Sequence, residues 1–212
     1  TICVPMDQIP VTLTLLPLQV GVLAARYVSR LLEACHASNN PSNKKGHATV
    51  KWPNDVLIDD KKVSGTLIES EVIDGTSWLL VGIGANVAFA PSLTGSPGKQ
   101  IRGATCLQEY CPDNLLPQDT AAILGLDLAN ALVEWVVDQE MDKTTKELKV
   151  IEDWKSFASF GGIYELRGNI AAENAGTHVG ESVVTVDIQN DGQLVVRGED
   201  GVQRSLIADY MF

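Results

Sequence analysis

The stretch KWPNDVLIDDKKVSGTLIES, residues 51–70, brings together the groups of this chain that best suit binding an anion. Asn54 and Asp55 follow a proline, at a turn where short polar side chains can bond the backbone or reach a ligand. Lys62 begins the next strand a few residues later, and hairpin geometry can bring its ammonium group back to that turn. A compact ammonium on a long stem suits a phosphate or a carboxylate. Residues 51–70 therefore predict the anion-binding end of a site.

A second stretch, VGIGANV at residues 81–87, supplies small residues and an amide. Gly65, Gly82 and Gly84 fall inside predicted strands, and a strand glycine often marks a bulge or a place where a ligand lies against the backbone. Asn86 follows the second glycine pair and can reach the same site. The two stretches together predict a groove with a backbone floor, with one ammonium and two amides at its rim. Such a groove suits a flat, mostly apolar ligand with an anionic end.

Each of these features also has a purely structural interpretation. An Asn-Asp pair after a proline is more often only a turn, and a lysine pair is usually a solvated hairpin edge. Trp52 is more often a core residue than a ligand platform. GIGANV is not a dinucleotide-binding fingerprint, because it lacks the third glycine and no helical pattern follows it. Only the co-occurrence of the features favours a functional site.

Helices are predicted on both sides of these stretches in the sequence. Apolar residues at spacings of four and three predict a helix from about Leu16 to Ala37. A second helix begins near Asp119 or Thr120, either of which can cap it, and a third runs from about Thr145 to Phe157. The apolar stripe of the second helix consists of Leu124, Leu128, Leu132 and Trp135, and that of the third of Leu148, Ile151 and Trp154.

The strands predicted around the candidate site are short. They cover about residues 49–52, 56–58, 62–72 and 78–83, and an Asp-Gly turn signal joins the last two into a hairpin. After residue 161 the pattern changes to apolar and polar alternation with two further Asp-Gly turns. We therefore expect an α/β domain at residues 1–161 and a small all-β barrel or sandwich at residues 162–212.

Composition limits the possible functions. The chain has 212 residues, 45% of them hydrophobic and 20% charged, which is typical of a globular protein. A net charge of −11 argues against general binding to a phosphate backbone, although a local lysine cluster can set the sign of one pocket. The four cysteines form no CxxC pair, so we expect no zinc site and reduced cysteines, as in the cytosol. No run of about 18 uninterrupted apolar residues exists, so no membrane span is expected.

The motifs resemble those of the biotin protein ligase family. KWPNDVLIDDKKVSGTLIE at residues 51–69 matches the family's Lys-Trp-Pro-Asn-Asp and lysine segment nearly throughout, and VGIGANV resembles its Gly-x-Gly-x-Asn-Val segment. TCLQEY at Thr105–Tyr110 is similar to the segment that follows. The resemblance implies an α/β (α+β) catalytic domain with helices on a mixed sheet. It also implies a small C-terminal β-barrel of the Src-homology-3 type.

The resemblance further implies an ATP-dependent carbon–nitrogen ligase. Such enzymes make biotinyl-5′-adenylate from biotin and ATP, releasing pyrophosphate. They then transfer biotin to one lysine of a biotin carboxyl carrier domain, in acetyl-CoA carboxylase or a related carboxylase. The expected partners are therefore this carrier domain, biotin, ATP and magnesium, in the cytoplasm, with no nucleic acid and no membrane.

Residue roles follow from the resemblance position by position. Lys62 matches the family's catalytic lysine, which would bond both the biotin carboxylate and the α-phosphate and so stabilise the charge of the reacting centre. Gly65 and Gly82 would let biotin lie against the strand backbone. The implied ATP-binding residues are Lys51, Asn54, Lys62, Asn86 and Thr105, and the implied magnesium ligand is Asp55, directly or through water.

One family feature is not found in this sequence. A Gly-Arg-Gly-rich loop with several biotin contacts precedes, in the family, the strand that corresponds to Thr1–Pro5. The expectation is that these 212 residues alone form little adenylate. Two alternatives stand beside the biotin ligase interpretation: a lipoate protein ligase-like enzyme, and a ligand-binding remnant without catalysis. A DNA-binding repressor is not expected, because no helix-turn-helix precedes the domain and the charge is acidic.

Overall fold

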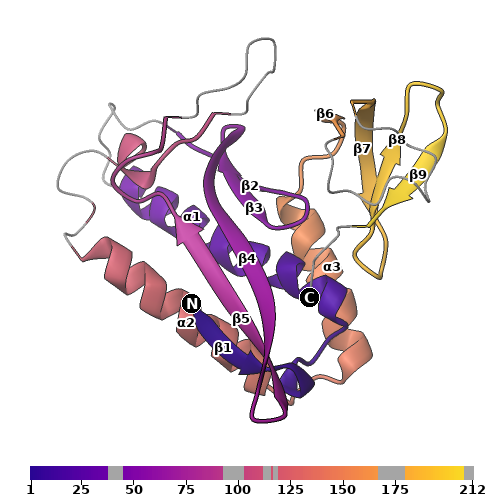
Figure 1. Ribbon diagram of the computed structural model, residues 1–212. Coiled ribbons are helices and arrows are strands. Elements are labelled where there is room, and N and C mark those ends of the chain that lie inside the picture. Colours follow the sequence, from indigo (N-terminus) through magenta and orange to yellow (C-terminus); the bar gives the residue numbers. More distant parts are fainter. Residues whose placement is uncertain (38–44, 93–102, 112–115, 117–118, 167–179, 208–212) are drawn as a thin grey trace.

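The structure is a computed structural model that describes residues 1–37, 45–92, 103–111, 116, 119–166 and 180–207. A five-stranded sheet of order β1-β5-β4-β3-β2 carries three helices on one face, and a four-stranded sheet follows (Figure 1). The strands of the large sheet are β1 (Ile2–Pro5), β2 (Ala48–Lys51), β3 (Asp55–Ile58), β4 (Lys61–Ile73) and β5 (Thr76–Ala85). The helices are α1 (Leu16–Ala37), α2 (Thr120–Val137) and α3 (Lys143–Phe157). Short 3-10 turns lie at Met6–Gln8, Leu13–Leu15 and Leu107–Glu109.

Helix α1 is the central element of the core, and its bounds are those predicted from the apolar periodicity. Most of its residues between Leu16 and Ala25 are buried, because the sheet lies on one side and α2 and α3 on others. Gly21 lets the helix approach the loop after β2, since a Cβ there would lie 3.3 Å from the Asn54 Cα. The core helix therefore supports the candidate site from behind.

The two later helices depart from the sequence prediction in detail. Leu124, Leu128 and Leu132 are buried on α2 as expected, but the Asp119 side chain makes no capping hydrogen bond. Helix α3 begins at Lys143, and Asp142 caps it by accepting from the Thr145 N–H. The buried residues of α3 are Lys146, Val150, Ile151 and Trp154.

The prediction that Leu148 belongs to the buried face of α3 is wrong, because its side chain is 47% exposed. Leu148 lies about 200° around the helix from Val150, which takes the buried position. The buried Lys146 replaces an apolar residue on this face, and its ammonium donates to the Trp135 and Asp138 carbonyls at the end of α2. A cation is favourable at that helix end.

Two helical segments are long and apolar enough to cross a membrane by length and composition alone: Leu13–Ala37 and α2. Within the apolar window, 67% of the first is buried inside the protein and 28% of the second. A core helix of a soluble protein passes the same test, so the finding is weak. The expectation of no membrane span stays a prediction.

The β4–β5 hairpin forms as predicted and is the longest pairing of the sheet. It runs from Ser64↔Ala85 to Ile73↔Thr76, and Asp74 and Gly75 make the turn with φ of 51° and 78°. The α+β class is confirmed, but the named strands of the sheet pair antiparallel rather than mixed. Parallel pairing occurs among the described residues only as isolated bridges, Val50↔Ala158 and Lys62↔Ala104.

The C-terminal β region forms a sheet of order β6-β7-β8-β9, of which β7, β8 and β9 are yellow in Figure 1. Its strands are β6 (Ile163–Glu165), β7 (Ser182–Ile188), β8 (Leu194–Arg197) and β9 (Gln203–Leu206). A closed barrel of the Src-homology-3 type is not shown by these strands. The sheet is joined to the helices by the Lys155–Asp187 ion pair, at 2.7 Å. The hydrogen bond from Lys155, followed by that from the Ile188 N–H, holds the pKa of Asp187 below its usual value.

A disulfide joins Cys35, near the end of α1, to Cys111, just after the loop that passes the candidate site. The expectation of reduced cysteines is therefore wrong for this pair, while Cys3 and Cys106 carry free thiols. The two bonded residues are 76 positions apart in the sequence, and no local pattern indicates their contact. Both are buried, at 3% and 0% exposure.

Reducing this disulfide should destabilise the fold. Closing a loop between residues 76 positions apart restricts the unfolded chain and corresponds to about 4.5 kcal/mol in the chain-entropy model. We expect dithiothreitol to lower the urea midpoint of the wild-type chain, and Cys35→Ser to have a lowered midpoint without reductant. A Cys3→Ser/Cys106→Ser variant, which keeps the bridge, serves as the control. Equal midpoints in oxidised and reduced wild-type protein would contradict the bridge.

Candidate active site

The centre of the candidate site is an ion pair between neighbouring strands. The Lys62 Nζ lies 2.6 Å from the Asp55 Oδ1, and the Lys51 Nζ lies 3.9 Å from the other oxygen of the same carboxylate. Lys51 and Asp55 are direct partners across the β2–β3 pair, and Lys62 is on the next strand. The structure thus brings the lysine back to the acidic turn, with two ammonium groups around one carboxylate. Lys62 keeps 47% of its side chain exposed, so its charge is available to a ligand.

Gly65 is what allows Lys62 to take this position. A Cβ at Gly65 would lie 2.7 Å from the Lys62 Nζ, 2.8 Å from its Cε and 2.9 Å from the Asp55 Oδ1. Any side chain here would therefore occupy the space in which the ion pair forms. Because Gly65 also pairs with Gly84 across β4 and β5, bare backbone extends from the ion pair over the sheet.

A groove of about 760 Å³ lies over this bare backbone. Its lining includes residues 62–67 of β4, residues 82–86 at the end of β5, and Thr1, Pro91 and Ala104. Side chains alternate along β5, so Val81 and Ile83 face the helices while Gly82 and Gly84 face the groove. The arrangement is a shallow apolar floor that ends at one ammonium group.

The backbone of Lys62 is held by the loop that follows residue 102. Its N–H donates to the Gly103 carbonyl at 2.9 Å, and its carbonyl accepts from the Thr105 N–H at 3.0 Å. The Asn86 amide donates to the Thr105 carbonyl at 2.9 Å, and the Asn86 carbonyl accepts from the Leu107 N–H. These bonds fix the start of β4 and the end of β5 to one loop, which the disulfide anchors at Cys111.

The structure divides the predicted site residues into two groups. Those that line the groove are Lys62, Gly65, Gly82 and Asn86. Those outside its lining are Lys51, Asn54, Asp55 and Thr105. Asn54 is 8% exposed, and its amide donates to the Thr66 carbonyl at 2.7 Å. Thr105 is completely buried, so its backbone and not its side chain approaches Lys62.

Two residues of the site were not predicted from the sequence. Ser64 supports the floor by donating to the Gly84 carbonyl at 2.8 Å, and Leu67 lies on the groove while 64% exposed. The alternation of β4 was a signal for Leu67, which shares the face of Gly65. A Ser within a strand carries no comparable signal.

Among the described residues, no group of three or more His, Cys, Asp or Glu side chains could hold a metal ion. Asp55 is a single carboxylate engaged by Lys62. Magnesium is commonly held by one or two carboxylates together with substrate phosphates, so Asp55 fits that role only if the ligand supplies the other oxygens.

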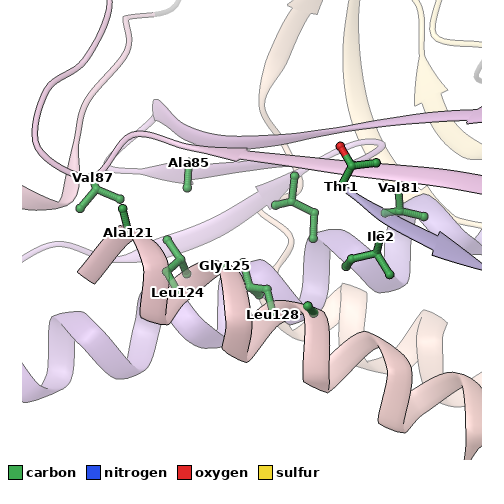
Figure 2. A pocket seen from close by; sticks show the side chains of 11 residues that line it. Thr1, Ile2, Val81, Ala85, Val87, Ala121, Leu124, Gly125 and Leu128 are labelled. Carbon is green, nitrogen blue, oxygen red and sulfur yellow. The ribbon is translucent and has the colours of Figure 1, made fainter. Parts of the chain in front are cut away.

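A second cavity, of about 260 Å³, lies on the opposite face of β5, between the strand and α2 (Figure 2). It is lined by apolar side chains such as Val81, Leu124 and Leu128 and by small residues such as Ala85 and Gly125. Among the described residues of its lining, the only polar side chain is that of Thr1. Since none of these lining residues has a titratable side chain, they do not suit catalysis.

Comparison with known proteins agrees with the fold. Residues 1–86 match the model of the Biotin/lipoate A/B protein ligase family. The biotin–[acetyl-CoA-carboxylase] ligase of Paracoccus denitrificans is 30% identical over an alignment of 214 residues, gaps included, and the alignment covers 98% of this chain and 81% of that protein. The chain therefore belongs to the biotin/lipoate A/B protein ligase family. Within that family it stands with the biotin protein ligases, and it is a ligase.

Solved structures show the same fold. The biotin protein ligase of Leishmania major in complex with biotin is 26% identical with a TM-score of 0.50, covering 98% of this chain and 77% of that one. The enzyme of Aquifex aeolicus in complex with biotin and ATP has a TM-score of 0.55 at 20% identity, covering 98% and 74%. The second likeness concerns the fold alone.

Proposed function

We propose that this chain forms biotinyl-5′-adenylate from biotin and ATP, with release of pyrophosphate. It then transfers the biotinyl group to a lysine of a biotin carboxyl carrier domain, in acetyl-CoA carboxylase or a related carboxylase. The observation that carries this proposal is the Lys62 ammonium at the end of the glycine-floored groove, where an apolar ligand with a carboxylate tail would place its charge. The named relative from Paracoccus denitrificans supports the choice of acceptor.

The catalytic residue in this proposal is Lys62. The biotin carboxylate must attack the α-phosphate, and two anions about 3 Å apart repel strongly where water is scarce. An ammonium between them offsets this repulsion and stabilises the charge that develops on the phosphate. The Asp55 carboxylate orients the amine toward the groove and competes with the ligand for it.

The remaining roles are assigned by position. Biotin would lie on Gly65 and Gly82, where the backbone is bare. Asn86 lines the same groove and would contact ATP with the amide oxygen that it does not use in holding Thr105. The proposed ATP-binding residues outside the groove lining are Lys51, Asn54 and Thr105.

Magnesium would enter with ATP. Asp55 would hold it, directly or through water, with the carboxylate oxygen that Lys62 does not engage. The ion would supply positive charge on the leaving pyrophosphate.

The proposal also includes a division into two domains, residues 1–161 for catalysis and 162–212 for the C-terminal β domain. The proposed enzyme is cytoplasmic and has no nucleic acid or membrane partner.

Isotope exchange between pyrophosphate and ATP tests the first half-reaction with the 212-residue chain. Exchange above background is expected with biotin and not with lipoate, and at a low rate for these 212 residues alone. Transfer of labelled biotin to an isolated carrier domain then tests the second half-reaction, with a carrier whose acceptor lysine is changed to arginine as the control. Exchange that depends on lipoate instead would favour the lipoate ligase alternative, and biotin binding without exchange would favour a non-catalytic remnant.

A further inference from the structure

Trp52 lies where the two sheets of the molecule meet. It packs against the main hydrophobic core, which contains α1, and also against the small core of the C-terminal sheet. Its indole N–H donates to the Gly192 carbonyl at 2.9 Å, in the turn between β7 and β8. One side chain of the lysine-containing motif is therefore bonded to a turn 140 residues away in the sequence.

The turn between β7 and β8 fits closely against the catalytic part. Gly192 has a φ of +88°, and a Cβ there would lie 3.1 Å from the Leu15 Cδ2 and 3.2 Å from the Thr14 carbonyl oxygen. The Thr14 hydroxyl donates to the Asp191 carbonyl at 2.7 Å. Both the backbone conformation and the close approach favour glycine at position 192.

Trp52 is also the first residue of the turn that carries the site. Residues 52–54 join β2 to β3, and the turn closes where Lys51 faces Asp55. Behind it lies Gly21 of α1, and on one side the Asn54 amide is bonded to the β4 backbone at Thr66. The hydrogen bond from Trp52 to Gly192 adds a third contact to this turn, from the C-terminal sheet.

We propose that Trp52 is a positioning residue for adenylate formation: the turn between β7 and β8 fixes residues 52–54 through Trp52, and so fixes Asp55 and the amine of Lys62. The inference rests on the proposed function, since it takes Lys62 as the catalytic group. Trp52 is absent from the groove lining and acts through Asp55, which lies 2.6 Å from the lysine. The C-terminal sheet thereby contributes to the geometry of a reaction whose groove its residues do not line.

The test compares two substitutions with a matched control. Trp52→Phe removes the N–H donor and keeps an aromatic ring, while Gly192→Ala forces the turn away from Leu15 and Thr14. Gly201→Ala is the control, because Gly201 has a φ of +78° in the turn between β8 and β9 and a Cβ there would meet nothing within 4 Å. Both glycine substitutions carry a similar backbone penalty, and only one disturbs the contact with Trp52.

We expect Trp52→Phe and Gly192→Ala to lower kcat for adenylate formation by about tenfold, since small misplacement of reacting groups has effects of this size. Biotin affinity should change much less, and Gly201→Ala should retain the wild-type kcat. In a Lys62→Ala background the Trp52→Phe substitution should have no further effect, because the group that it positions is gone.

The outcomes separate this inference from the proposed function. A wild-type chain with no biotin-dependent exchange above background would contradict the proposed function itself. An active wild type with Trp52→Phe at full kcat would overturn the positioning role, whether or not Gly192→Ala folds. Equal losses in Gly192→Ala and Gly201→Ala would show a contribution to stability only. An undiminished Trp52→Phe effect in the Lys62→Ala background would show that the effect does not pass through Lys62, and would overturn the inference as well.

Discussion

Replacing Lys62 by alanine is expected to lower the rate of biotinyl-adenylate formation by on the order of 10²–10³-fold, the usual scale for losing one transition-state stabiliser. The ammonium of Lys62 lies at the groove, 2.6 Å from Asp55, and no other described lysine lines that groove. Lys61→Ala should have only a mild effect, because side chains alternate along β4. The side chain of Lys61 lies beside Gly103 instead. Its Cγ is 3.6 Å from the place that a Cβ on Gly103 would take. Biotin-dependent release of pyrophosphate measures both variants.

The two lysines form a matched pair for this experiment. Both begin β4, both are exposed and both carry the same charge, so the variants have the same net charge and differ in position alone. Thermal midpoints should stay near that of the wild type, since exposed ion pairs contribute little to stability. Equal losses of activity in the two variants would refute the assignment of Lys62.

Much of the fold could be predicted because its signals are local. The apolar periodicity of α1 predicted its bounds, and the Asp74-Gly75 turn predicted the β4–β5 hairpin. Helix α1 has a strong amphipathic pattern, and the hairpin has a turn that requires positive φ.

The features that the sequence did not reveal depend on contacts between segments far apart in the sequence. The bridge between Cys35 and Cys111 spans 76 positions, and the bond from Trp52 to Gly192 spans 140. Leu148 is apolar and fits a helical stripe, but its exposure is decided by how α3 lies on α1. Single-sequence patterns contain no information about such packing.

Part of the candidate site could be predicted, because that part also depends on local structure. The approach of Lys62 to the acidic turn follows from two adjacent hairpins, which are local structures. The burial of Asn54 and Thr105 was not predictable, because Asn54 packs against Gly21 of α1 and Thr105 lies in the loop that is bonded to the start of β4. The structure therefore adds a supporting layer to the site, made of backbone bonds around Lys62.

Gly65→Val is expected to abolish biotin binding while leaving the fold intact. The Cβ of any residue here would lie within 3 Å of the Lys62 Nζ and the Asp55 Oδ1, so the ion pair must move. The Lys62 side chain is 47% exposed and that of Asp55 21% exposed, so the lysine can turn toward solvent at little cost to stability. The valine methyl groups would in addition occupy the groove floor where biotin is proposed to lie. Calorimetric titration with biotin and a thermal melt measure the two effects separately.

Glu71→Val is the control, because Glu71 is exposed on the same face of β4, six residues along the strand and outside the groove lining. It adds the same side chain to the same strand and should bind biotin like the wild type. Gly65→Ala adds only the Cβ, and it should therefore impair adenylate formation through Lys62 more than it impairs biotin binding. Lost binding with an unchanged melting midpoint would support a ligand-facing Gly65. A midpoint that falls in Gly65→Val and not in Glu71→Val would instead make Gly65 a packing glycine, and the bare backbone of the groove would have a structural cause.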